Sequence, residues 1–358
     1  MIVKVKAENR FAPVPILAAG CAFPSGPNLR LADMAARTNL CLFRHHPDYV
    51  DQCGYRVRCS IFPPPVQSTQ RWLELIHAAL QDLLSHVPQT AKRCLERREV
   101  ALWLVLPESG RPGVPADLGE QLSDLFNPHW AQIRLTKGQH TATADAIVEA
   151  ASWTDQTTRF AVVLAADTPY DCDTLRWLER RELLNGARKA YRDQARANPY
   201  GRVAGEGAAA IMVGPPGYGS AWCRITGLAR AQERSTFDKT EPCLGKGLTA
   251  AALRAIEIAA LPAHDITCLI HDANGEPGRS DEFAYTALRL TDKLAKNWER
   301  SIPAIASGDL LTASLATHVT IASWRINKSS SRPFGGTTLV LGSSDSAERA
   351  ALVLQKGV

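Results

Sequence analysis

The feature that most constrains this chain is a regular alternation of short apolar stretches with segments of helical periodicity. Residues 100–106 (VALWLVL) and 160–165 (FAVVLA) are apolar at successive positions, which is typical of strands buried on both faces. Residues 69–84 instead place apolar side chains such as Trp72 and Leu83 at helical spacing. This alternation predicts an α/β protein with a mostly parallel sheet covered by helices on both faces. The other predicted strands are residues 15–22, 132–135, 205–213, 223–229, 266–271 and 337–341, and the other predicted helices are residues 31–43, 116–125, 141–153, 249–260, 281–294 and 311–326.

An internal repeat divides the chain into two similar halves. Ala151-Ser152-Trp153 recurs as Ala322-Ser323-Trp324, and each copy ends a helix of small residues that is followed by a strand rich in Val and Leu. A helix without a charged face can be buried on all sides, so we expect these two helices to lie side by side between two sheets. The duplication predicts an N-terminal half, residues 1–214, and a C-terminal half, residues 221–358, within one compact unit.

Composition and charge limit the classes of partner and location. A net charge of +5 over 358 residues is mild, and no basic run interleaved with aromatic residues indicates nucleic-acid binding. No stretch approaches the roughly 18 consecutive apolar residues that a membrane span requires, and the start of the chain lacks the apolar core of a signal peptide. We therefore expect a cytoplasmic protein that binds neither nucleic acid nor a membrane.

The cysteines predict reduced thiols rather than a disulfide framework. There are nine of them, scattered along the chain without a CxxC pair or a close cluster with histidine. Because the usual structural zinc sites need close ligand pairs in the sequence, we expect no metal and no cofactor.

Seven segments, in order along the chain, resemble motifs of the β-ketoacyl-carrier-protein synthases of the thiolase superfamily. They are PILAAGCAFPSG from residue 15, GQHTATADAIVEA from 138, AVVLAADTP from 161, GRVAGEGAAAIMV from 201, DITCLIHDANGEPGRSDE from 265, SGDLLTASLATHVTIAS from 307 and RPFGGTTLVLGS from 332. Each motif alone is weak, but together they span most of the chain in the family's order. The resemblance implies a five-layered α-β-α-β-α fold built from two duplicated halves.

The chain departs from this family at the three positions that carry its condensation chemistry. The family's nucleophile is a cysteine at a helix N-terminus, where the thiolate is stabilised. The matching position here is His140, or Gln139 if the register slips by one residue, and no cysteine lies between Cys94 and Cys172. The two histidine positions hold Asp272 and Asp309, although His271 directly precedes the first. The resemblance therefore implies a divergent member that has lost condensation chemistry.

The replaced residues leave several interpretations open. His140 between two carboxylates could act as a general base, or it could form a buried ion pair that fills a lost pocket. Glutamine at position 139 resembles the decarboxylase-type or chain-length-factor relatives, which carry glutamine in place of the cysteine. Residues 272–276 could be a simple Asn-Gly turn, or a polar network with Arg279 and Glu282 that replaces a histidine.

The resemblance also implies residues that support the pocket and its partners. The pocket or structural residues are Glu206, Glu276, Phe334, Gly335 and Gly336. A basic segment, residues 176–202, is either a solvated helix or a docking face for an acidic partner such as acyl-carrier protein. The candidate partner-binding residues are Arg180, Arg181, Arg188, Lys189 and Arg192.

Three functions follow as hypotheses. The first is a non-catalytic binding or assembly protein, accessory to a biosynthetic cluster or to a secretion system of type VI. The second is an acyltransferase, or a 3-oxoacyl synthase or chain-length-factor-like subunit of a synthase heterodimer. The third is a protein that binds an acyl chain in the old tunnel without turnover. The resemblance implies a dimer, with itself or with an active homologue, paired through residues 160–165 as an edge strand, and an exposed apolar edge strand would be an aggregation hazard if left unpaired.

Overall fold

The computed structural model describes residues 12–62, 69–188, 197–236, 241–329 and 336–357, together with the backbone of residues 5–6. The strands are β1 (Val5–Lys6), β2 (Val14–Ala22), β3 (Arg44–Val50), β4 (Arg56–Ser60), β5 (Ala101–Pro107), β6 (Ile133–Gly138), β7 (Ala161–Asp167), β8 (Ala204–Gly205), β9 (Gly207–Val213), β10 (Cys223–Gln232), β11 (Ile266–Ile270), β12 (Leu294–Ser301), β13 (Thr337–Ser343) and β14 (Glu348–Lys356). The α-helices are α1 (Leu29–Thr38), α2 (Thr69–His86), α3 (Gln89–Glu96), α4 (Leu118–Phe126), α5 (Ala142–Thr157), α6 (Cys172–Arg180), α7 (Lys246–Ile258), α8 (Pro277–Arg289), α9 (Ala304–Ser307) and α10 (Ser314–Lys328), and two short 3-10 helices are η1 (Asn127–His129) and η2 (Leu311–Ala313).

The main sheet repeats one topology in its two halves. Its path runs β12-β11-β13-β14-β10 and then β2-β9-β7-β5-β6, with β1 attached to β10. In one half, β11 pairs in parallel with β12 and β13, and the next two pairings, β13 with β14 and β14 with β10, are antiparallel. In the other half, β5 pairs in parallel with β6 and β7, and the next two pairings, β7 with β9 and β9 with β2, are antiparallel. The halves meet where β10 pairs with β2 through only three residue pairs, from Val14↔Ile225 to Ile16↔Cys223. A join this short lets the two half-sheets face one another across a shared core.

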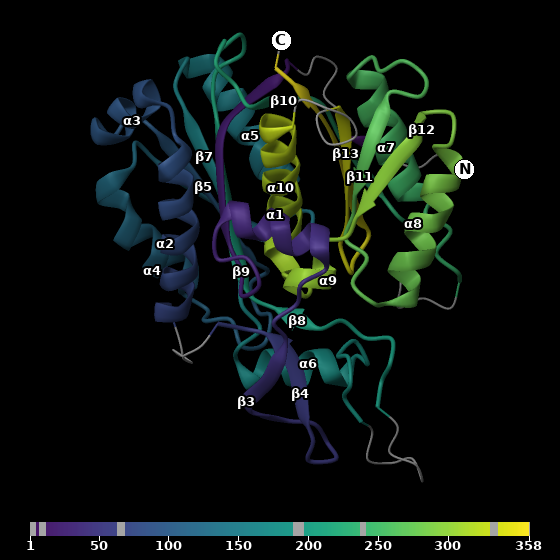
Figure 1. Ribbon diagram of the computed structural model, residues 1–358. Coiled ribbons are helices and arrows are strands. Elements are labelled where there is room, and N and C mark those ends of the chain that lie inside the picture. Colours follow the sequence, from purple (N-terminus) through teal and green to yellow (C-terminus); the bar gives the residue numbers. More distant parts are fainter. Residues whose placement is uncertain are drawn as a thin grey trace.

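Figure 1 shows the resulting layers. Helices α2, α3 and α4 cover the outer side of one half-sheet, α5 and α10 lie between the half-sheets, and α7 and α8 cover the outer side of the other. Three apolar clusters fill the spaces between these layers. The central cluster contains small residues of α5 and α10, including Ala146, Ala150, Ala316 and Ala322, while the outer clusters surround α2 and α7. This is the predicted five-layered arrangement, and α10 is the small-residue buried helix that the sequence indicated.

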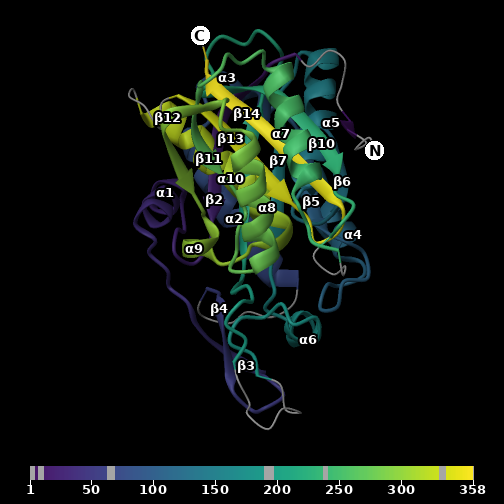
Figure 2. The ribbon, with the colours of Figure 1, turned by 90° about the vertical axis from the view of Figure 1, so that its right-hand side faces the viewer.

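Smaller elements carry the loops that approach the centre of the molecule. Strands β3, β4 and β8 form a separate three-stranded sheet, which protrudes together with α6 below the layers (Figures 1 and 2). A parallel bridge joins Ala204 of β8 to Asp309. The protruding sheet is therefore anchored directly to the loop before α10.

Most predicted elements are present, but three expectations were wrong. Residues 160–165 form β7, which lies between β5 and β9 and is not an edge strand. Among the described strands, the free edges of the main sheet are β6 and β12. The predicted helix 281–294 ends at Arg289. Leu294, the last residue of the predicted helix, instead begins β12. The polar sequence LAKNWERS of β12 gives no apolar strand signal, because most of its side chains are at least partly exposed. The basic segment 176–202 contains helix only up to Arg180 within its described part.

None of the helices among the described residues combines the length and apolar character needed to cross a bilayer.

Close packing of β2 on α2 predicts a specific cost for one added methyl group. A Cβ at Gly20 would lie 2.2 Å from the backbone nitrogen of Leu83 and 2.6 Å from the carbonyl oxygen of Ala79. Gly20→Ala should therefore lower the free energy of unfolding in urea by about 1–3 kcal/mol or more, because backbone atoms must shift. Gly219→Ala is the matched control, since a Cβ there meets nothing within 4 Å. Equal unfolding midpoints for the two variants would contradict this packing.

Candidate functional site

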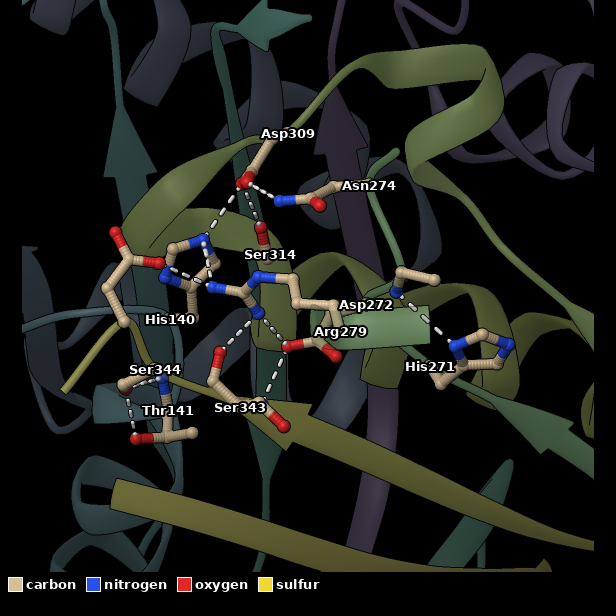
Figure 3. Close-up of polar contacts among 12 residues, drawn as sticks. His140, Thr141, His271, Asp272, Asn274, Arg279, Asp309, Ser314, Ser343 and Ser344 are labelled. Atoms are coloured by element: carbon tan, nitrogen blue, oxygen red, sulfur yellow. Dashed lines mark hydrogen bonds and ion pairs between the residues drawn. The ribbon is translucent and has the colours of Figure 1, made fainter. Parts of the chain in front are cut away.

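The candidate site lies where the N-terminal ends of the two central helices meet. His140 stands two residues before α5, and Asp309 stands two residues before η2, which leads into α10. Asp309 is fixed by backbone hydrogen bonds, since its N–H donates to Val203 and its carbonyl oxygen accepts from Gly205. The loop after β11 brings Asp272 and Asn274 to the same place, as Figure 3 shows. Equivalent loops of two similar half-sheets thus converge.

His140 and Asp309 form a buried hydrogen-bonded pair. Nε2 of His140 lies 2.9 Å from Oδ1 of Asp309, and both side chains are almost fully buried. Asp309 also accepts hydrogen bonds from the amide of Asn274 at 2.5 Å and from the backbone N–H of Leu311 at 2.8 Å. Burial alone would raise the pKa of Asp309, but His140 and Arg202 outweigh it and hold the pKa well below its usual value. Asp309 is therefore a carboxylate at neutral pH.

Arg279, on the first turn of α8, connects the remaining acids. One of its terminal nitrogens donates to Asp272 at 2.8 Å and to the carbonyl oxygen of Ser343 at 2.5 Å, and the other donates to Asp345 at 2.7 Å. Asp272 also accepts from the backbone N–H of Ser343 at 2.6 Å. The second terminal nitrogen lies 3.4 Å from Nε2 of His140. Because Asp309 is 0.5 Å nearer to that nitrogen, we assign the His140 proton to the bond with Asp309.

Arg202 is the second buried cation of this network, and its position corrects the expectation of a basic surface. It belongs to the segment interpreted as a docking face, yet its side chain is fully buried. It donates to Glu276 at 2.7 Å and to Asp345 at 2.7 Å, and it lies 3.2 Å from Asp309. Burial would lower the pKa of Arg202, but Asp345 and Glu276 raise it well above its ordinary value. Arg202 is an internal cation rather than a contact residue.

The network therefore sets four carboxylates against two guanidinium groups, with His140 between them. Burial opposes the charge on Asp345, but Arg202 and His140 lower its pKa far below its usual value. Little space remains around these groups. The cavity beside His140, lined also by Gln139, Arg111 and Trp177, measures about 30 Å³. The cavity beside Asp272 and His318 measures about 10 Å³. Neither has room for more than one water molecule, and neither is lined by a cysteine of the described chain.

Other predicted site residues have different surroundings. Gln139 turns its amide oxygen to the backbone N–H and hydroxyl of Ser346. His271 stacks on Phe283 with ring centroids 3.5 Å apart, and its ring lies away from His140 in Figure 3. Burial and the neighbouring His318 lower the pKa of His271 well below its usual value, so this ring is neutral at pH 7. The residue of the 271–272 pair that enters the site is therefore Asp272.

The supporting glutamates separate into two roles. Glu206 is fully buried and paired with Arg71, and it also accepts from the hydroxyl of Thr168 at 2.8 Å. It joins β9 to the start of α2 and lies outside the His140 network. Glu276 belongs to the network through Arg202 and Arg279, whereas Glu282 pairs with Arg349 instead.

The remaining predicted residues are surface groups or lie outside the described residues. Arg180 and Arg181 are exposed, and Arg181 stacks on Trp177 while approaching Asp345 at 3.7 Å. Arg188 covers the ring of Tyr55 at 4.1 Å. Gly336 directly precedes β13, and a Cβ there would lie 2.5 Å from the hydroxyl of Thr267. Lys189, Arg192, Phe334 and Gly335 lie outside the described residues.

Sequence reasoning missed Asp345 and the inward position of Arg202. Asp345 lies two residues after the end of β13, in a polar Ser-Ser-Asp-Ser run that also fits an ordinary surface turn. It is buried against Arg202 and Arg279, which are far away in sequence. A charged residue shortly after a buried strand was the one available signal for it.

Similarity to known proteins is found among solved structures. Neither a protein-family model nor a curated protein sequence matches the chain. A ketosynthase from module 6 of the bacillaene synthase of Bacillus subtilis superposes with a TM-score of 0.73 at 14% identity, covering 96% of this chain and 72% of the other. A chain of a type II polyketide synthase complex, described as acyl-carrier protein with its ketosynthase bound to the hexaketide, gives 0.74 at 12% identity, covering 96% and 99%. The ketosynthase in complex with its chain length factor from Xenorhabdus doucetiae gives 0.70 at 14% identity, covering 98% and 100%.

This chain has the thiolase-like fold of ketosynthases. Identities this low establish the fold alone, so the chemistry of the site must be argued from its own residues.

The balance of charges predicts how one arginine affects stability. Arg202→Met removes the cation that contacts Glu276, Asp309 and Asp345, leaving Arg279 alone to pair with two of them, and should lower the free energy of unfolding by about 3–5 kcal/mol at pH 7. Arg254→Met is the control, because Arg254 pairs only with the exposed Glu257, an interaction worth less than about 1 kcal/mol. Equal losses in the two variants would show that the network does not stabilise the fold.

The lowered pKa values of Asp309 and Asp345 predict a matching pH dependence. Their pKa values in the folded chain lie below the unfolded value of about 3.9, so their contribution is complete above about pH 5 and is lost as the pH falls further. Denaturant unfolding should thus show wild-type stability declining below about pH 4. In Arg202→Met the acids lose one of their cations and with it part of this pH-dependent stabilisation, so the deficit relative to wild type should shrink as the pH falls below about 5.

Proposed function

We propose that this protein is a non-condensing subunit of a ketosynthase-like assembly, which pairs with an active homologue in the manner of a chain-length factor. The observation that carries the proposal is the buried His140–Asp309 pair, at the position that the sequence resemblance assigns to the nucleophile, inside a network that leaves a cavity of about 30 Å³. A subunit of this kind has an assembly role and is also part of a synthase heterodimer, and both roles require that the chain no longer catalyses condensation.

The first reason is the absence of a suitable nucleophile. Condensation needs a group that forms a thioester with the acyl chain, and a thiolate at a helix N-terminus provides it. The residue that the resemblance assigns to this place, just before the N-terminus of α5, is His140, whose imidazole is hydrogen-bonded to Asp309. No cysteine of the described residues lines either site cavity. Wherever a shift is resolved for one of these cysteines, burial raises the pKa of its thiol, as for Cys21 and Cys223. Such thiols are poor nucleophiles.

The second reason is electrostatic. Decarboxylation and condensation build negative charge on an enolate oxygen, which needs hydrogen-bond donors or cations in front of it. The two positions that would supply neutral or positive imidazoles hold the carboxylates of Asp272 and Asp309. Two anions would repel both a malonyl carboxylate and the developing enolate. The substitutions thus oppose the reaction instead of merely weakening it.

The similar solved structures support the heterodimeric form of the proposal. Several of them are described as pairs of a ketosynthase and a chain-length factor, including the ishigamide pair and the pair from Xenorhabdus doucetiae. Strand β6 is the free edge of the half-sheet that leads into α5, and Leu135 on it is 38% exposed. We place the partner along β6, because an exposed apolar edge strand is stabilised by pairing.

A second candidate function rests on one unsatisfied atom. Nδ1 of His140 is buried and has no hydrogen-bond partner, and it belongs to a histidine that Asp309 orients through Nε2. A histidine held in this way can act as a general base in acyl transfer. The experiment below separates the two functions.

The decisive experiment is coexpression of this chain with an active ketosynthase homologue and its acyl-carrier protein, followed by purification of the complex and product analysis. We expect a stable complex whose acyl adduct, by intact mass, is on the homologue alone. His140→Gln keeps a donor for Asp309 but removes the base, so product formation should stay within about threefold of wild type. A loss of more than about 100-fold, or an acyl adduct on this chain, would favour the acyltransferase and overturn the proposal.

The proposed interface gives a separate prediction. Leu135→Glu places a charge on the edge strand and should abolish the complex in size-exclusion chromatography with light scattering, because burying an unpaired charge is costly. Leu288→Glu is the matched control, since Leu288 is 71% exposed on α8. If Leu135→Glu still forms the complex, the partner does not bind along β6.

Docking of acyl-carrier protein on α6 is the remaining part of the proposal. Arg180 and Arg181 are exposed at the end of α6, next to the mouth of the His140 cavity that Trp177 lines. Two adjacent guanidinium groups suit an acidic partner. A role beside a secretion system or a biosynthetic cluster is proposed on the resemblance, and copurification from the native host addresses it.

A further inference from the structure

A second cluster of polar side chains lies one helical turn along α8 from Arg279. Glu233 follows the end of β10, Cys243 lies in the loop that leads to α7, and Glu282 lies on α8. One potential ligand atom from each of the three lies within 4.8 Å of the others. The sequence predicts no metal centre, because it contains no close pair of zinc ligands. The fold brings them together.

Glu282 points into this cluster with one oxygen unpaired. Its side chain is 1% exposed, and Oε1 interacts with Nε of Arg349 at 2.5 Å and with Sγ of Cys243 at 3.7 Å. Oε2 is buried and has no hydrogen-bond partner. A buried carboxylate oxygen without a partner costs free energy, so its retention calls for a ligand.

Glu233 is held in place by the backbone. It is 5% exposed, and its two oxygens accept from the N–H groups of Arg234 at 3.0 Å and Gly247 at 2.7 Å. Each carboxylate oxygen has two lone pairs, so both oxygens still have one available. The backbone bonds orient the carboxylate before any ligand arrives.

We propose that Glu233, Cys243 and Glu282 bind one zinc ion. Zinc accepts thiolate and carboxylate ligands together, whereas magnesium and calcium prefer oxygen ligands only. Three protein ligands leave the fourth tetrahedral position to water. Cys243 is partly exposed, so the ion can enter from solvent.

The charges of the cluster fit a divalent cation. On binding, the Cys243 thiol releases its proton to solvent, and its sulfur forms the bond to zinc. Three negative ligands then face the buried Arg349, which offsets one of them. The two remaining charges equal that of the zinc ion. Arg349 also donates to the carbonyl oxygens of Ser344 and Ser346, so it keeps a position beside the ion.

Binding would join three separate parts of the C-terminal half. The ion would link the end of β10, the loop before α7 and the first half of α8. A ligand that binds the folded chain alone raises its stability with concentration. The melting temperature should therefore rise when zinc is added to metal-free protein.

The test uses cobalt as a spectroscopic substitute for zinc. Metal-free full-length protein is titrated with Co²⁺ and then with Zn²⁺, and a thiolate-to-cobalt charge-transfer band is recorded. We expect one equivalent of Co²⁺, a charge-transfer band that Zn²⁺ abolishes, and a higher melting temperature. Cys243→Ser should remove the band and lower zinc affinity by more than about 100-fold, since loss of outer-shell groups alone costs 10–100-fold. Cys41→Ser, at an exposed cysteine, is the matched control.

A second variant guards against a folding artefact. Glu233→Gln leaves the Glu282–Arg349 pair intact and should weaken zinc binding while circular dichroism stays unchanged. No stoichiometric binding by the wild type, or equal binding by wild type and Cys243→Ser, would overturn the proposal. Neither result depends on whether the chain pairs with a ketosynthase.

Discussion

The buried arginines Arg202 and Arg279 hold together the centre of this protein. Between them they contact Asp272, Glu276, Asp309 and Asp345, which come from three separate loops. Burying four carboxyl groups in such a small volume would be costly without these cations. The two arginines therefore determine both how the loops meet and how little space is left between them.

The architecture explains why these loops meet. Each half-sheet places a central helix after its third strand, and the two helices lie side by side with their N-terminal ends at one point. His140 and Asp309 occupy corresponding places before α5 and η2–α10. A ketosynthase-like fold thus provides a site at the convergence of its halves whatever residues stand there, and these residues decide its chemistry.

In this chain, the residues at the convergence favour a closed and anionic core. His140 is held by Asp309, and Asp272 is held by Arg279 and the backbone of Ser343. An arrangement of this kind is stable only while every member is present, because removing one charge leaves its partner buried and unpaired. The proposed loss of condensation chemistry and the stability of the centre have the same physical cause.

The sequence by itself indicated the order of most strands and helices and the duplicated topology, and its resemblance to the synthases implied that the three chemical positions are replaced. Hydrophobic periodicity and local motifs carry this information, because each depends on neighbouring residues. The tertiary structure alone decided that β7 is internal, that Arg202 points inward and that Asp345 joins the network. It also brought Glu233, Cys243 and Glu282 together. Strand pairing and the partners of a buried charge depend on residues far apart in the chain, and a single sequence does not record which distant segments meet.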